Sequence, residues 1–271
     1  MESTKKLLLI FLVVFGFSFQ ICAKTPRAQF TFVQITDMQM GMISKNLNYD
    51  EEERLYKLAI AEINLLKPKF VIITGDFVNN RTDTNQIKAF KQLTLISKRI
   101  PTYLIPGNHD VGQLPNKESL DFYFKHYSSD KFEFEYKGLQ FIGINSSLIN
   151  SGTEQEKEQL IWLKNTLKNT KGRIIFSHHP FFIADINEKD SYSNIPLQKR
   201  LDYMQLFKEN GVKMIFAGHY HNNAIALYDG IQMITTSAVG KQLGKVKSGF
   251  RLITVYKDSI SHKYVELPTE R

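Results

Sequence analysis

The sequence predicts a single α/β domain in which two β-sheets pack face to face and helices cover the outer faces. Strand and helix patterns alternate along most of the chain, and from Asn223 onward the pattern is that of strands alone. No repeat and no long linker divides the sequence, and 271 residues suit one large α/β domain.

Five short apolar runs are the predicted strands that matter most, because each ends in a turn rich in possible metal ligands. The runs cover residues 30–36, 70–74, 102–106, 173–177 and 214–217. The turns that follow them are Asp37-Met38-Gln39, Gly75-Asp76, Gly107-Asn108-His109-Asp110, His178-His179 and Gly218-His219-Tyr220-His221. Ligands in α/β proteins bind in the crevice beyond the carboxyl ends of the strands. The five turns can therefore form one polar pocket.

The remaining elements follow from periodicity and turn residues. The first helix is expected to run to residue 66, with Asp50 as its N-cap. Further helices are expected over 85–98, 119–127, 154–167 and 197–209. The runs 131–136 and 139–145 are predicted to form a β-hairpin with its turn at Lys137-Gly138. Further strands are expected at 224–228, 231–236, 250–256 and 259–265. Residues 181–196 lack periodicity and follow the histidine pair, so they are predicted to form a loop over the site.

Composition places the chain among ordinary globular proteins. Hydrophobic residues make up 42% and charged residues 23%, which argues against disorder. The formal net charge is +8, and the lysines are spread along the chain. This charge favours anionic substrates, while the lack of a basic block gives no support to dedicated nucleic-acid binding.

The first 23 residues are predicted to be a signal peptide, followed by one domain over 24–271. Lys5-Lys6 precedes an apolar stretch from residue 7 to 19, and Ala23 is a suitable residue for cleavage after it. The stretch is too short to favour a spanning helix, so we expect export to the periplasm or the medium without a membrane span. An uncleaved anchor and lipidation at Cys22 are the less favoured alternatives.

The ligand types in the five turns point to borderline divalent metals. Carboxylates, an amide oxygen and imidazoles together suit Mn, Fe, Zn or Co. His219 and His221 are two residues apart, so in an extended segment they project to one side. Gly75-Asp76 alone is an ordinary turn, and His126 and His262 are expected at the surface or in the core.

These turns, in this order, resemble the pattern of the calcineurin-like metallophosphoesterase family, which is Asp-x-His, Gly-Asp, Gly-Asn-His-Asp/Glu, His and Gly-His-x-His. The resemblance implies a four-layer α/β/β/α sandwich with two divalent ions. One ion would bind Asp37, the residue at 39, Asp76 and His221; the other would bind Asp76, Asn108, His178 and His219. His109 would assist the leaving group after attack by a metal-bridging hydroxide. Asp110, His179 and Tyr220 would lie beside the ligands or the substrate.

Two positions depart from the family pattern. Gln39 stands where most members have histidine, which implies a harder and more weakly held first ion. Asn79 stands where some members have an aspartate that orients the catalytic histidine, and we expect Asn79 to hydrogen-bond His109. The segments 32–41 and 236–244 resemble the branch typified by calcineurin-like phosphoesterase domain-containing protein 1.

The leading hypothesis is a metal-dependent phosphomonoesterase that acts on a phosphorylated small molecule or phosphoprotein, and that is a monomer. A phosphodiesterase or nuclease is the alternative enzyme, since the same centre serves both reactions. A weakly active, metal-dependent binder of phosphate ligands is the alternative outside the enzymes.

Overall fold

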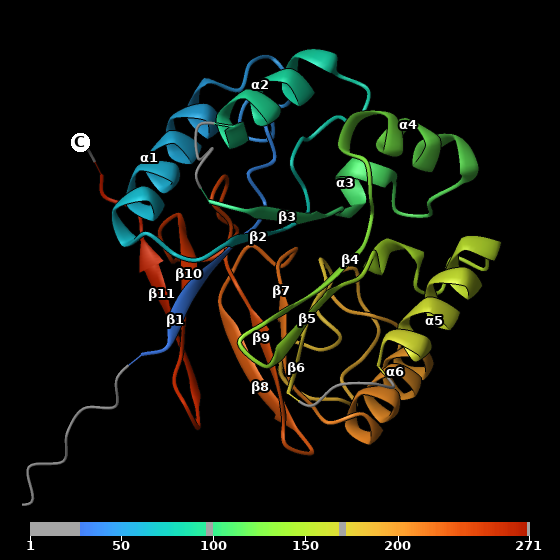
Figure 1. Cartoon of the computed structure of the whole chain (residues 1–271). Helices are drawn as coiled ribbons and strands as arrows, with labels where there is room; N and C mark the ends of the chain where they lie inside the picture. The colour runs from blue at the N-terminus through green and yellow to red at the C-terminus, as the bar shows by residue number, and fades with distance from the viewer. Residues whose placement is uncertain (1–27, 96–99, 168–171, 270–271) are drawn as a thin grey trace, which may run out of the picture.

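Two mixed β-sheets pack face to face between layers of helices in the computed structural model of the chain (Figure 1). The structure describes residues 28–95, 100–167 and 172–269. The first sheet has the strand order β11-β10-β1-β2-β3, and the second has the order β4-β5-β6-β7-β9-β8. This is the α/β/β/α arrangement implied by the resemblance, and that expectation is confirmed.

The strands of the first sheet are β1 (Phe30–Ile35), β2 (Val71–Thr74), β3 (Thr102–Ile105), β10 (Gly249–Val255) and β11 (Ile260–Glu266). Those of the second are β4 (Phe132–Tyr136), β5 (Leu139–Gly143), β6 (Arg173–Phe176), β7 (Val212–Ala217), β8 (Ala224–Tyr228) and β9 (Ile231–Thr235). β1, β2 and β3 are parallel neighbours, and so are β5, β6 and β7. Parallel neighbours end at the same edge of a sheet, so the ligand turns after β1, β2 and β3 share one edge, as do those after β6 and β7.

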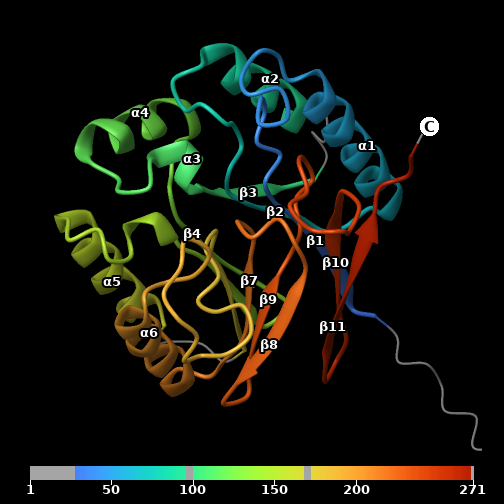
Figure 2. The same cartoon turned by 180° about the vertical axis from the view of Figure 1, so that it is seen from behind.

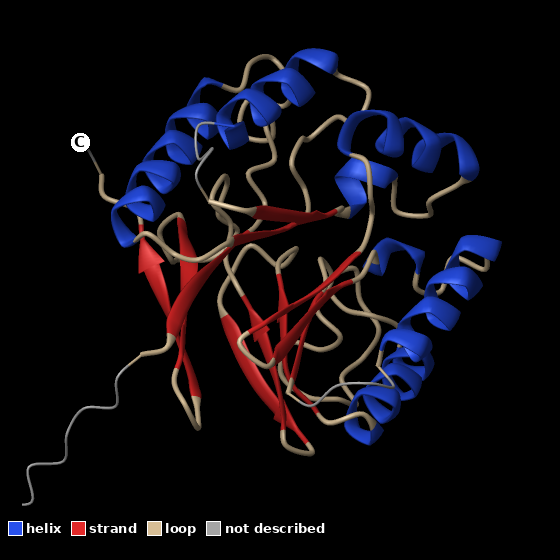
Figure 3. Cartoon of the chain, in the orientation of Figure 1, coloured by secondary structure: helices blue, strands red, loops and turns tan. Residues whose placement is uncertain are grey.

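Helices cover the outer face of each sheet (Figures 2 and 3). The first sheet carries α1 (Asp50–Leu66), α2 (Thr84–Thr94), α3 (Asn108–Val111) and α4 (Lys117–Tyr127), and the second carries α5 (Glu154–Thr166) and α6 (Leu197–Glu209). Ile63 of α1 and Phe90 of α2 share a buried cluster with the strand residue Ile73. Met204 of α6 packs in the corresponding cluster of the second sheet.

Aromatic rings fill the space between the two sheets. Phe32 stacks on Phe70 with ring centroids 5.0 Å apart, and Phe70 meets Phe141 of the opposite sheet edge-on, also at 5.0 Å. Phe176 and Phe216 stack at 5.6 Å. Burial of such side chains contributes about 1.5–3 kcal/mol each. This core holds the two sheets together, and with them the two groups of strand ends.

The structure corrects some predicted element ends. α1 begins at Asp50, and Tyr49 is its N-cap, without a side-chain cap hydrogen bond. Asp50 therefore lies in the first helical turn, where its negative charge interacts favourably with the helix dipole. α2 is N-capped by Asp83 and is described as far as Thr94, because the end of the predicted helix 85–98 lies outside the described residues. The short helix α3 was not predicted.

The N-terminal prediction is not tested by the structure. The proposed signal peptide, residues 1–23, lies outside the described residues. Within the described part of the chain, none of the helices combines the length and the apolar character needed to span a membrane.

Candidate metal centre

The backbone of the ligand turns is unusual. Asp37, Gln39, Asp76, His219 and His221 all have positive φ angles, of 54°, 43°, 51°, 65° and 50°. This left-handed region costs a residue other than glycine about 1–3 kcal/mol and is found mostly where the surrounding structure enforces it at functional sites. Five candidate ligands therefore adopt conformations that tight packing of the turns must hold in place.

Main-chain hydrogen bonds tie the turns after β1 and β2 to one another. The N–H of Asp37 donates to the carbonyl of Gly75 at 3.1 Å, and the N–H of Gln39 donates to that of Asp76 at 2.8 Å. The turns also approach so closely that Gly107 has no room for a side chain, since a Cβ there would lie 2.5 Å from the nitrogen of Asp76. Glycine at 107 is therefore a requirement of the packing at the site.

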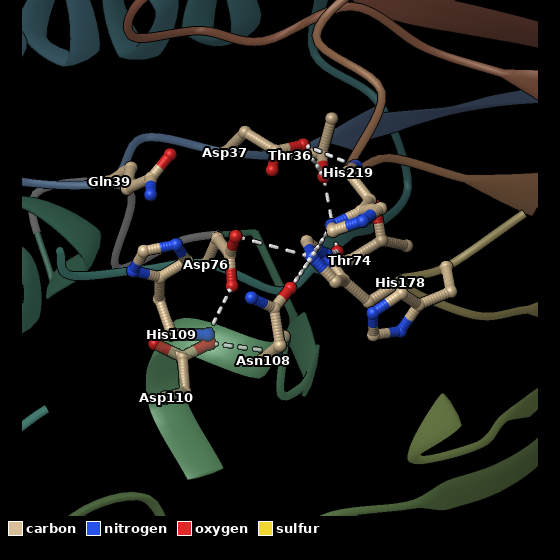
Figure 4. A network of polar contacts seen from close by, with 12 residues as sticks. Thr36, Asp37, Gln39, Thr74, Asp76, Asn108, His109, Asp110, His178 and His219 are labelled. Atoms are coloured by element: carbon tan, nitrogen blue, oxygen red, sulfur yellow. Dashed lines mark hydrogen bonds and ion pairs between the residues drawn. The ribbon is translucent and has the colours of Figure 1, made fainter. Parts of the chain in front are cut away.

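One group of ligand atoms gathers around Nε2 of His178 (Figure 4). Oδ2 of Asp76, Oδ1 of Asn108 and Nδ1 of His219 each lie 3.2 Å from this nitrogen. All four side chains are buried. The predicted ligands of the second ion therefore lie together, although they come from four different turns.

Main-chain carbonyls determine which nitrogen of each histidine in this group carries the proton. Nδ1 of His178 lies 2.8 Å from the carbonyl of Thr74, and Nε2 of His219 lies 2.8 Å from the carbonyl of Tyr192. A carbonyl only accepts hydrogen bonds, so these two nitrogens are the donors. In the neutral rings, the lone pairs of Nε2 of His178 and Nδ1 of His219 therefore face each other, together with the oxygens of Asp76 and Asn108. A cation between these atoms satisfies all of them.

A second group lies around Asp37. Nδ1 of His221 is 2.5 Å from the carbonyl of Lys241, so its Nε2 lone pair faces Oδ1 of Asp37, 3.2 Å away. Oδ1 of Asp37 and Oε1 of Gln39 are buried and have no hydrogen-bond partner among the described residues. Orphaned buried acceptors are costly, by about 1–3 kcal/mol each. These atoms fit a cation as well.

The two groups share Asp76. Ligand atoms of Asp76, His178 and His219 lie within 4.8 Å of one another, and so do those of Asp37, Asp76 and His221. Two carboxylates and three imidazoles are therefore arranged around two adjacent positions, with Oδ1 of Asn108 against His178 and the amide of Gln39 on the side of Asp37 (Figure 4). This donor set fits two divalent ions bridged by Asp76.

The pKa shifts reflect the same preference for positive charge. Burial alone lowers the pKa of His178, but Asp76 and Asp37 outweigh it and raise the pKa to about 9. Burial and the neighbouring His178 lower the pKa of His219 to about 4. The carboxylates therefore attract positive charge at His178, while a second proton on His219 is disfavoured.

His109 lies at the edge of this centre, on α3, and is half-buried. Its main-chain N–H donates to Oδ1 of Asp76 at 2.8 Å, and its Nδ1 lies 2.9 Å from the carbonyl of Asn79. Nδ1 is therefore the donor to this carbonyl, which leaves Nε2 to face a reacting group. The expected contact between Asn79 and His109 exists, but the main chain of Asn79 makes it.

The other residues expected near the site have different positions. Asp110 accepts hydrogen bonds from the main-chain N–H groups of Gly107 (2.8 Å) and Phe77 (3.0 Å), so its carboxyl holds the turns in place. Burial and the nearby Asp76 raise its pKa well above the usual range. His179 is buried, with its ring centroid 4.2 Å from that of His219. Tyr220 is half-buried, and its main-chain N–H donates to Gly218.

Tyr192, in the loop predicted to cover the site, contacts two candidate ligands and was not among the predicted site residues. Its hydroxyl accepts a hydrogen bond from Nδ2 of Asn108 at 2.9 Å, which turns Oδ1 of Asn108 toward His178. Its carbonyl orients His219, as described above. The position of the loop after His178-His179 was the available signal, but the sequence did not distinguish Tyr192 from its neighbours.

Hydrogen bonds hold this loop in place on both sides of Tyr192. The carboxylate of Glu188 accepts the main-chain N–H groups of Ile183 and Ala184 at 2.8 and 2.9 Å. Arg200 of α6 is fully buried and donates to the carbonyls of Ile186, Glu188 and Ile195 at 2.6–3.0 Å. These bonds make the loop a fixed wall of the site.

Comparisons with known proteins agree with this geometry. A family model described as calcineurin-like phosphoesterase matches residues 30–223. The serine/threonine-protein phosphatase CPPED1 of Danio rerio is 34% identical, over 88% of this chain and 85% of the relative, and that of Homo sapiens is 31% identical, over 89% and 85%. A probable glycerophosphodiester phosphodiesterase GpdQ of Arcobacter nitrofigilis is 31% identical, over 78% and 79%.

A solved structure supports the fold independently. The crystal structure of a dimetal phosphatase from Danio rerio superposes with a TM-score of 0.64 at 16% identity, and the match covers 89% of this chain and 98% of the other. The strand-end ligands, the fold and the relatives agree. The chain belongs to the calcineurin-like phosphoesterase family, in the branch that contains CPPED1, and is a metal-dependent hydrolase of phosphoric esters.

Proposed function

We propose that this protein is a phosphomonoesterase that works with two divalent ions chosen from Mn, Fe, Zn and Co. The observation that carries the proposal is the convergence of imidazole nitrogens and carboxylate and amide oxygens on two positions that share Asp76. Asp37, Gln39, Asp76 and His221 would hold one ion, and Asp76, Asn108, His178 and His219 the other. Bound there, the ions would neutralise the phosphoryl oxygens and lower the pKa of an attacking water.

The protein itself supplies the proton for the departing alcohol. Nε2 of His109 faces the site because Nδ1 donates to the carbonyl of Asn79, and Asp76 holds the main chain of His109 in place. In the imidazolium form, which carries a proton on both ring nitrogens, His109 can pass its Nε2 proton to the leaving oxygen, a contribution of about 10²–10⁴-fold. The positive φ angles and interlocked turns keep the ligands in place before substrate binds.

The surroundings favour a neutral leaving group. A cleft of about 130 Å³ lies beside Tyr192 and His179. None of the side chains that line it is charged, because burial and the neighbouring histidines keep the pKa of His179 well below its usual value. Such a cleft suits a small alcohol or the side chain of a phosphorylated serine or threonine, which matches the name of the CPPED1 relatives.

The alternative is a phosphodiesterase, favoured by the 31% identity to the GpdQ relative. The test is to remove metals with a chelator, load Mn²⁺, and compare hydrolysis of p-nitrophenyl phosphate with that of bis(p-nitrophenyl) phosphate. We expect the monoester to be cut faster. A clear preference for the diester would overturn the proposal, and no hydrolysis of either at full metal occupancy would indicate a phosphate-binding protein instead.

We also propose that residues 1–23 direct export and are removed, and that the mature protein is a monomer in the periplasm or the medium. The charged start, the apolar stretch and Ala23 support this assignment. Mass spectrometry of protein from the extracytoplasmic fraction should show an N-terminus at residue 24. Light scattering should give the mass of one chain, and a larger mass would contradict the monomer.

A further inference from the structure

We infer that four side-chain amides form a hydrogen-bonded relay that presents the oxygen of Gln39, and not its NH₂ group, to the first ion. The amide relay consists of Gln86, Asn46, Asn79 and Gln39. The inference rests on the proposed metal centre. It explains how a glutamine can act as a ligand at residue 39, where the family pattern has histidine. The amide can bind a cation only through its oxygen, because its NH₂ group would repel the cation.

The relay starts at Gln86 of α2, whose side chain is 1% exposed. Its Oε1 lies 3.1 Å from the main-chain nitrogen of Asn79 and 2.9 Å from that of Asn80. A main-chain N–H can only donate, so the oxygen of the Gln86 amide must be the atom on this side. The NH₂ group of Gln86 must therefore point the other way, toward Asn46.

The middle of the relay is the side chain of Asn46. Nε2 of Gln86 donates to Oδ1 of Asn46 at 3.0 Å, and Nδ2 of Asn79 donates to the same oxygen at 2.8 Å. Because Gln86 presents a donor, Asn46 must present its oxygen. Because that oxygen accepts, Asn79 must present its NH₂ group to Asn46 and its oxygen to the other side.

The end of the relay is Gln39. Its Nε2 donates to Oδ1 of Asn79 at 3.2 Å, and its Oε1 is buried without a hydrogen-bond partner among the residues described. Figure 4 shows Gln39 beside Asp37 and Asp76, the two carboxylates proposed for the first ion. Reversing Gln39 alone would set its oxygen against Oδ1 of Asn79. Reversing the whole relay would set the NH₂ group of Gln86 against two main-chain donors.

The relay therefore gives the first ion a defined oxygen ligand. The first position then has two carboxylates, one amide oxygen and one imidazole, whereas the second has one carboxylate, one amide oxygen and two imidazoles. Oxygen-rich sites suit harder ions such as Mn²⁺, and imidazoles suit Zn²⁺. The other three amides act as positioning residues, since they orient Gln39 and do not bind the ion themselves. They are Asn46, Asn79 and Gln86.

Asn46 offers a matched pair of variants that tests the relay. Its φ of +68° is accessible to glycine and is tolerated by aspartate, so neither variant is expected to strain the backbone. Asn46→Gly removes the oxygen that accepts from Gln86 and Asn79, and Asn46→Asp keeps such an oxygen. Calorimetric titration of the chelator-treated protein with Mn²⁺, with metal content measured separately, reports the affinity of each ion independently of activity.

We expect wild type to bind two Mn²⁺ ions, and Asn46→Gly to bind one of them about 10-fold more weakly, as is common for residues that orient metal ligands. Asn46→Asp should bind both like wild type. In a Gln39→Leu background, Asn46→Gly should have no further effect, because residue 39 can no longer supply an oxygen.

Wild-type affinity in Asn46→Gly, or an equal loss in the Gln39→Leu background, would overturn the relay while leaving the metal centre intact. Failure of wild type to bind Mn²⁺, Zn²⁺, Fe²⁺ and Co²⁺ would instead refute the metal centre, and the relay with it. If circular dichroism shows that Asn46→Gly does not fold, Asn79→Ala removes the next amide. The same selective loss is expected there, and unchanged binding would again overturn the relay.

Discussion

Replacement of Arg200 by methionine tests whether the loop over the site is a fixed wall. The guanidinium is fully buried and satisfies the carbonyls of Ile186, Glu188 and Ile195. Methionine has similar length but no donor, so three carbonyls lose their partner at about 1–3 kcal/mol each. Removal of a buried cation offsets part of this cost. We therefore expect the lower end, about 3 kcal/mol.

Such a loss should be visible both globally and locally. For a domain of this size, 3 kcal/mol corresponds to a fall in Tm of about 6–12 °C. Hydrogen exchange should accelerate most in the segment 183–195, which Arg200 holds. Because the carbonyl of Tyr192 orients His219, the second ion should also bind more weakly in a Mn²⁺ titration.

Gln198→Met is the matched control, since Gln198 is an exposed residue of the same helix. This variant should unfold like wild type, with unchanged exchange in the loop. The reasoning is wrong if Arg200→Met and Gln198→Met have the same free energy of unfolding and the same exchange rates in segment 183–195.

Three further predictions concern the centre itself. His109→Ala should lower kcat for p-nitrophenyl phosphate by about 10²–10⁴-fold while metal content stays at the wild-type value; loss of metal would show that His109 acts through the ligands instead. Gln39→His should shift the first position toward Zn²⁺ in competition titrations against Mn²⁺, and an unchanged preference would argue against residue 39 as a ligand. The chelator-treated protein should be less stable to urea at pH 9.5 than at pH 6.5. The pKa of His178 is about 9 when folded and 6.5 as its ordinary value, so its stabilisation is present below pH 6.5 and is lost as the pH rises through 9. Higher stability at pH 9.5 would contradict this assignment.

Much of the fold could be predicted because its signals are local. The hairpin across Lys137-Gly138 is present, with φ of 50° and 78° at the turn, and α6 spans the predicted range Leu197–Glu209. Apolar runs and turn residues report on the few residues around them, so such elements can be predicted from sequence. The N-cap of α1 was misassigned by one residue, because Asp50 and its acidic neighbours suit either the cap or the first turn.

The site was only partly predictable. The ligand types and their places after strands were visible in the turns. Tyr192 and Arg200 were missed, because each acts through segments that periodicity does not connect to the site. Asn46 and Gln86 were missed for the same reason. They lie 40 positions apart in the sequence, and an isolated amide in a sequence carries no sign of its orientation.

The sequence by itself determined which side chains can reach one edge of the fold. The apolar runs predict parallel strands, neighbouring parallel strands end at the same edge of a sheet, and the turns after them carry the candidate ligands. Only the tertiary structure decided which atoms of those side chains face the proposed ion positions. Nδ1 of His178 is held by a carbonyl 104 positions away, and Oε1 of Gln39 is left facing the site by an amide 40 positions away. A neutral imidazole or amide can face either way, and only neighbours in space, with groups that can solely donate or solely accept, remove that choice.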